Sequence, residues 1–92
     1  MMVTLEEMKQ YLRVNFDDDD SLISSLIASS EKLCQSVARI DTQREINKHQ
    51  EELKTAVLYT VAYLYEHREH ADYKTLTLTI RSLLFGVRKA VF

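Results

Sequence analysis

Apolar residues recur at helical spacing through the middle of the chain, from Glu51 to His70. Positions three, four and seven apart share one side of a helix, and the residues at these spacings are Leu53, Ala56, Val57, Val61, Leu64 and Tyr65. A further three apolar residues widen this stripe until little of the segment's middle is polar: Tyr59, Ala62 and Tyr63. The pattern predicts one central helix over residues of about 47–70, with neighbours on more than one side.

A capping box opens the first predicted helix. In this motif the Thr4 hydroxyl accepts a hydrogen bond from the amide of Glu7, and the Glu7 carboxylate reaches back to the amide of Thr4. The apolar residues that follow predict a short amphipathic helix ending at about Arg13, and they are Leu5, Met8, Tyr11 and Leu12.

Four consecutive acids, Asp17 to Asp20, separate this helix from a second one. We interpret them as a solvated loop that ends in a helix N-cap, with Asp19, Asp20 or Ser21 as the cap residue. A calcium loop needs ligands at alternate positions and a Gly at its turn, and the run has neither. From Ser21 to residues 38–40, one helical face is apolar, with Leu22, Ile23, Leu26, Ile27, Leu33, Cys34 and Val37.

The polar stretch from Asp41 to Gln50 predicts a loop into the central helix, whose start lies anywhere between Thr42 and Gln50. Ile46 is expected to anchor this loop on the core. Residues 71–74 predict a second loop beyond the central helix.

The C-terminal segment has two interpretations. Residues 75–80 alternate with the period of a strand, whereas the spacing of Ile80, Leu83, Leu84 and Val87 suits a helix. Because no other segment offers a partner strand, we predict a short helix from about Leu78 to Phe85, ended by Gly86. The fold class is therefore all-α: a small bundle of about four helices around one long central helix, with a short C-terminal helix or an extended tail.

Composition supports this fold class and a single domain over residues 1–92. The chain has one Gly, no Pro and 46% hydrophobic residues. With one Cys it forms no internal disulfide, and a chain of this size has a thin stability margin, so oligomerisation is the remaining route to extra stability.

No apolar run approaches a membrane span, and the N-terminus lacks the apolar core of a signal peptide. We expect a soluble, cytoplasmic protein.

Charge is distributed unevenly along the chain. The net charge of −2 argues against a generic nucleic-acid binder. Residues 1–20 carry a net −4 and residues 73–92 a net +4. Opposite charges at the two ends of the chain make head-to-tail contact between copies electrostatically favourable.

The sequence contains little that suggests catalysis. It has no Gly-rich phosphate loop, no CxxC and no HExxH motif. His67 and His70, three apart on the predicted helix, are spaced to share a metal, and His49, distant in sequence, is a candidate third ligand. The favoured interpretation is a polar helix C-terminus, with histidines near the negative end of the helix dipole. Cys34 lies on an apolar stripe, where we expect a small buried hydrophobe. We expect no enzyme activity, no cofactor and no metal.

Arg68 stands near the end of the central apolar stripe. A long basic side chain there is placed to reach the acidic loop or the start of the second helix, and we predict a structural ion pair with Asp20. An exposed, solvated arginine is the equal alternative, and such a pair would contribute only about 0–1 kcal/mol.

Three stretches of the chain, in order and spacing, resemble the small head–tail connector (adaptor) proteins of long-tailed bacteriophages and prophages. They are Val3 to Val14 followed by the acidic run and residues 22–27, then Ala56-Val57-Leu58 leading to residues 64–69, and finally Ile80 to Arg88. The resemblance covers nearly the whole chain. Many members have a Pro shortly before the last segment and an Asn where His67 stands, and this chain has neither.

The resemblance implies a helical subunit that assembles into a ring between the portal and the tail and lines the DNA passage without reading the sequence. Its partners would be further copies of the chain, the portal protein and the neck or tail-completion proteins. It would reside in the virion neck, and in the cytoplasm of the bacterial host during assembly. Its function would lie in its surfaces.

The hydrophobic residues at the C-terminal end can complete the subunit's own core or contact a neighbouring protein. We expect Leu83 and Leu84 to complete the subunit's own core. The predicted interface with a neighbour or the portal comprises Phe85, Val87, Arg88, Lys89, Val91 and Phe92.

The alternative function is a small helical DNA-binding regulator with a helix-turn-helix. Such a protein needs a recognition helix rich in basic or amide side chains. The second predicted helix has only Lys32 and Arg39, and the alternative depends on the last segment with Arg81, Arg88 and Lys89.

Overall fold

The computed structural model describes residues 2–40 and 42–85, and this part of the chain contains five helices and no strand. The helices are α1 (Leu5–Leu12), α2 (Asp20–Ala38), α3 (Gln43–Lys48), α4 (Gln50–Glu66) and α5 (Tyr73–Leu83). The all-α prediction is therefore confirmed. The molecule is elongated, with principal extents of 45 × 27 × 16 Å.

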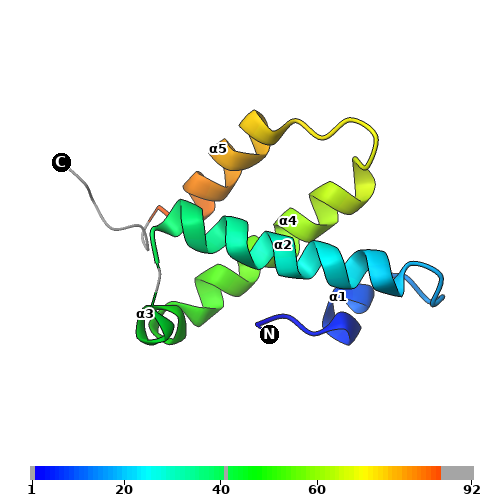
Figure 1. The fold of residues 1–92 in the computed structure, drawn as a ribbon, viewed down its shortest axis with the longest axis horizontal. Coiled ribbons are helices and arrows are strands. Elements are labelled where there is room, and N and C mark those ends of the chain that lie inside the picture. Colours follow the sequence, from blue (N-terminus) through cyan, green and yellow to red (C-terminus); the bar gives the residue numbers. More distant parts are fainter. Residues whose placement is uncertain (1, 41, 86–92) are drawn as a thin grey trace.

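The two longest helices, α2 and α4, cross at the centre of the molecule and make its most extensive helix–helix contact (Figure 1). α1 packs against both of them, and α5 also contacts both, running back alongside α4 toward the C-terminal end of α2 (Figure 1). The core that they enclose is continuous, and its fully buried side chains include Met8, Ile23, Ile27, Leu53, Val61, Leu76 and Ile80.

Small polar side chains lie in the core between α2 and α4. Thr60 Oγ1 donates to the carbonyl of Ala56 at 2.7 Å, so it accepts from the thiol of Cys34, whose Sγ lies 3.5 Å away. Burial raises the pKa of the Cys34 thiol. The prediction of a small buried hydrophobe at Cys34 is confirmed.

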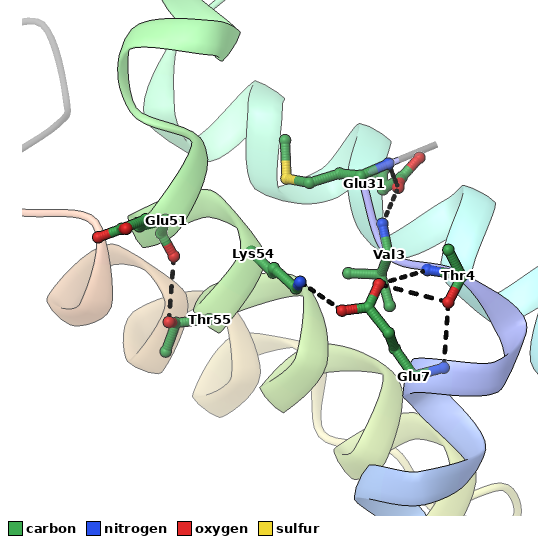
Figure 2. Close-up of polar contacts among 8 residues, drawn as sticks. Val3, Thr4, Glu7, Glu31, Glu51, Lys54 and Thr55 are labelled. Atoms are coloured by element: carbon green, nitrogen blue, oxygen red, sulfur yellow. Dashed lines mark hydrogen bonds and ion pairs between the residues drawn. The ribbon is translucent and has the colours of Figure 1, made fainter.

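α1 begins and ends as its sequence predicts. The Glu7 amide donates to Thr4 Oγ1 at 3.1 Å, and the Thr4 amide donates to Glu7 Oε1 at 3.1 Å, so both halves of the capping box form (Figure 2). The helix ends at Arg13, which takes a left-handed conformation at φ 60°. Arg39 ends α2 in the same way at φ 59°, a conformation that costs a non-Gly residue roughly 1 kcal/mol.

The central helix begins at Gln50, within the predicted range of starts from Thr42 to Gln50 and three residues after the bound of about 47. It ends at Glu66, so the prediction that it extends to about residue 70 is wrong at this end. His49 leaves the helical region at φ −114° and separates α4 from α3. At the other end, the His67 ring Nδ1 lies 2.9 Å from the carbonyl of Tyr63 and takes part in ending the helix.

The prediction of a loop from residue 41 to 50 is wrong for residues 43–48, which form α3. The Thr42 hydroxyl accepts from the amide of Glu45 at 3.2 Å and caps this short helix. Ile46 is partly buried against the core, as expected for an anchor.

The last helix begins five residues earlier than predicted, at Tyr73 instead of Leu78. The Asp72 carboxylate caps it by accepting from the Thr75 amide at 3.2 Å and from the Thr75 hydroxyl at 2.8 Å. These bonds lower the pKa of Asp72. The helical period, not the strand period, matches the burial, since Leu76 and Ile80 are buried and Leu78 is 53% exposed.

Candidate functional site

The acidic run between α1 and α2 is held by a lysine from α1. Lys9 Nζ lies 2.8 Å from Asp17 Oδ1, to which it donates a hydrogen bond, and 2.8 Å from Asp20 Oδ1. The hydrogen bond to Asp17 is the main cause that raises the pKa of Lys9, and it lowers the pKa of Asp17 in return. Two of the four acids thus share the single positive charge of Lys9 within the subunit.

A third acid, Asp19, binds the end of α4. The Tyr65 hydroxyl donates to Asp19 Oδ2 at 2.5 Å, and Arg68 Nη1 lies 3.8 Å from the same oxygen. The Arg68 guanidinium also stands over the Tyr65 ring, 4.7 Å from its centroid. The hydrogen bond to Asp19 is the main cause that raises the pKa of Tyr65.

This geometry corrects the partner predicted for Arg68. The structure pairs Arg68 with Asp19, one residue before the predicted Asp20, whose Oδ1 is instead buried against Lys9. Asp19 is also the N-cap residue of α2, but its side chain makes no cap hydrogen bond. Its carboxylate turns to Tyr65, a partner 46 residues away that helical spacing within either segment does not reveal.

A surface groove of about 260 Å³ opens beside this cluster. Leu22 and Leu26 of α2 and Leu64 of α4 line it. Ala71 and Tyr73, around the start of α5, complete the apolar lining, and the rim carries His67 and Arg68. The groove is not evident from the sequence, because all three leucines belong to apolar stripes that are expected to face the core.

The end of α5 presents apolar side chains to solvent. Phe85 is 82% exposed and Leu83 is 41% exposed, whereas Leu84 between them is fully buried. The expectation that Leu83 and Leu84 both complete the core is therefore confirmed for Leu84 and wrong for Leu83. Of the predicted interface, only Phe85 lies within the described residues, and Val87, Arg88, Lys89, Val91 and Phe92 lie outside them, as does Gly86.

The histidines do not form the metal site considered for them. His67 ends α4 and stacks on Tyr63, with ring centroids 4.2 Å apart, while His70 lies beyond the helix, so the three-residue helical spacing is lost. His49 stands at the opposite end of the 17-residue α4, about 26 Å along the axis. Within residues 2–40 and 42–85, no three His, Cys, Asp or Glu residues are grouped to hold a metal ion.

The N-terminal segment is fastened to the middle of α2. Glu31 Oε2 accepts from the amide of Met2 at 2.7 Å and from that of Val3 at 3.3 Å (Figure 2). Lys54 of α4 forms an ion pair with Glu7 on the same side, and its hydrogen bond is the main cause that lowers the pKa of Glu7 (Figure 2). A second, more polar groove of about 260 Å³ lies between Met2, α2 and the α3–α4 junction.

The surface of the described chain thus offers two grooves and the exposed Phe85 side chain. The ion pairs of Lys9, Lys54 and Arg68 join neighbouring helices and loops of the subunit. No helix in the described part of the chain has the length and hydropathy needed to cross a membrane.

Comparison with known proteins identifies one family. The family model described as "Phage gp6-like head-tail connector protein" matches residues 2–91, which is nearly the whole chain. Neither the curated proteins nor the solved structures include a match.

Proposed function

Because the chain belongs to the phage gp6-like head-tail connector family, we propose that it is a structural subunit that assembles into a ring between portal and tail. The DNA would pass through the lumen of this ring without being read in sequence. The family is a structural one, and membership implies a place in the virion neck and contacts with portal and tail proteins. In the proposed life cycle, the subunit resides in the host cytoplasm until it assembles.

The observation that carries this proposal is the family match over residues 2–91. Two features of the fold support it. An aromatic side chain, Phe85, is exposed at the end of α5, where the sequence analysis predicts an interface. In the described chain, Lys74 and Arg81 of α5 have no ion pair, so this helix keeps its positive charge for a partner.

We include the segment after Phe85 in the proposed interface. It carries Val87, Val91 and Phe92 together with Arg88 and Lys89, a combination suited to an apolar contact with an acidic surround. A chain truncated after Val87 should keep its helical content and lose assembly or portal binding. Unchanged assembly and an unchanged fold would remove this segment from the interface.

Size measurement in solution across a range of concentrations, followed by negative-stain imaging, tests the ring. The measurement is made on the chain alone and with the portal protein of the same phage, because a portal can trigger assembly. Rings in either sample support the proposal, whereas a monomer in both contradicts it.

The DNA-binding alternative is not favoured by the family match. A gel-shift at physiological salt separates the two functions, since a regulator retains a sequence-specific shift there and a connector subunit does not.

A further inference from the structure

Phe85 is the most exposed large hydrophobic side chain in the described part of the molecule. It is 82% exposed, whereas its neighbour Leu84 is fully buried and fixes the end of α5 on the core. The backbone at Phe85 is therefore held by the subunit, through the amide that donates to the carbonyl of Ser82 at 3.4 Å, while the ring projects away from it. Exposed aromatic side chains are enriched at protein interfaces, so the Phe85 ring is suited to anchor one.

The apolar groove beside the Asp19–Tyr65–Arg68 cluster has a size and a lining that suit the Phe85 side chain. Its volume of about 260 Å³ lies below the range of sites for drug-sized ligands, and its apolar wall suits one large hydrophobic side chain. The wall is built by three separate segments, α2, the end of α4 and the start of α5, which gives it a defined shape.

A subunit's own Phe85 does not reach this groove. Tyr73, which lines it, begins α5, and Phe85 stands twelve positions later, about 18 Å along the helix direction. Figure 1 shows that α5 runs away from the α4–α5 connection toward the C-terminal end of α2, at the other side of the molecule. A Phe85 side chain that enters this groove therefore comes from another molecule.

The charges around the two surfaces are complementary. Arg81 lies one helical turn before Phe85 and has no ion pair within the described residues. Beside the groove, Glu66 at the end of α4 and Glu69 in the α4–α5 connection are exposed and have no ion pair within the described residues. The Arg68 charge on the rim is paired with Asp19, so the two acids outnumber the charge of Lys74, which follows Tyr73. A copy that offers Phe85 to the groove thus brings a positive surface to a negative one.

We propose that Phe85 of one copy packs into the groove between Leu22, Leu26, Leu64, Ala71 and Tyr73 of the next copy. This contact rests on the proposed function, because it names the head-to-tail joint by which the ring would be built. The two surfaces differ, so the contact is heterologous and repeats from copy to copy, closing into a ring if the rotation allows it.

Cysteine cross-linking tests the joint directly. The native Cys34 is fully buried, so it does not compete for reagent in the folded protein. The double variant Ser82→Cys/Ala71→Cys keeps the Phe85 ring and places one thiol beside each half of the joint, since Ser82 is exposed three positions before Phe85. Treated with a short thiol-to-thiol cross-linker, it should give a ladder of trimers and larger species on a denaturing gel. Each single variant should give dimers at most, because it carries only one half of the joint.

The matched control pairs Ser82→Cys with Tyr11→Cys, since Tyr11 is 52% exposed on α1 and does not line the groove. This control should form no ladder. A double variant that stops at dimers, or a control that forms the same ladder, overturns the proposed joint.

The substitution Phe85→Ala, which removes the aromatic side chain, provides an independent measurement. It should raise the concentration required for self-association about tenfold or more while leaving the far-ultraviolet circular dichroism unchanged. If it weakens only the binding of the portal protein, Phe85 belongs to a portal contact and the proposed joint is wrong. Wild-type rings without a cross-linked ladder reject the joint and leave the connector function standing, whereas a wild-type chain that forms no ring even with the portal rejects the function itself.

Discussion

The hydroxyl of Tyr65 donates a hydrogen bond to the Asp19 carboxylate across 46 residues of sequence, at 2.5 Å. It joins the loop before α2 to the last turn of α4 beside the apolar groove. Because Arg68 stacks on the same ring and approaches the same oxygen, the three side chains hold the two segments in one arrangement.

Removing this hydroxyl should destabilise the protein. Tyr65→Phe keeps the ring under Arg68 and removes only the hydrogen bond, so the midpoint of urea unfolding should fall. Tyr59→Phe is the matched control, since it makes the same change on the same helix at a hydroxyl with no hydrogen bond in the described structure. Equal effects of the two variants would show that the Tyr65–Asp19 bond contributes nothing.

The same bond predicts a pH signature. The Asp19 hydrogen bond raises the pKa of Tyr65 above its ordinary value of 10.0. A raised pKa means that the stabilisation is complete below pH 10.0 and is lost as the pH rises through the folded-state value. The stability difference between wild type and Tyr65→Phe, measured by urea unfolding, should therefore shrink at alkaline pH.

The Lys9 bridge to Asp17 and Asp20 predicts the opposite dependence. Lys9 lowers the pKa of Asp17 below 3.8, so its stabilisation is present above pH 3.8 and is lost as the pH falls through the folded-state value. Lys9→Met should lower the melting temperature at pH 7 and low salt, and the difference from wild type should shrink at about pH 3 and in high salt. Lys48→Met, at an exposed lysine of α3, is the control and should change little.

The two adjacent leucines at the end of α5 should differ sharply. Leu84→Ala removes a fully buried side chain and should cost about 2–5 kcal/mol of unfolding free energy. Leu83→Ala, at a side chain that is 41% exposed, should cost about 1 kcal/mol or less. Urea unfolding of both variants measures this, and similar costs would mean that α5 is rotated from its described position.

One substitution should stabilise the protein. Ser30 is fully buried on α2, and its Oγ has no hydrogen-bond partner among the described residues, a state that costs roughly 1–3 kcal/mol. Ser30→Ala should therefore raise the unfolding free energy by about 1 kcal/mol or more. Ser29→Ala, next to it and exposed, controls for helix propensity and should gain only a few tenths of a kcal/mol. Equal gains would show that the Ser30 hydroxyl is satisfied.

Local chemistry is what the sequence by itself determined. The capping box of Thr4 and Glu7 forms as predicted, and the apolar periods of α1 and α2 place both helices within a residue or two of their observed bounds. These features depend on contacts within one helical turn, so they are encoded in neighbouring residues. Thr42 and Asp72 cap α3 and α5 by equally local bonds, so the starts of these helices are also encoded in neighbouring residues, although the apolar period alone does not reveal them.

Only the tertiary structure decided which distant side chains meet. Asp19 and Asp20 are equivalent in sequence, yet the crossing of α2 and α4 gives one to Tyr65 and Arg68 and leaves the other to Lys9. In the same way, the packing of α5 buries Leu84 and exposes Leu83 and Phe85. Sequence periodicity defines a helical face, but the angle at which that face meets its neighbours sets the burial of each residue on it, and with it the groove and the exposed ring.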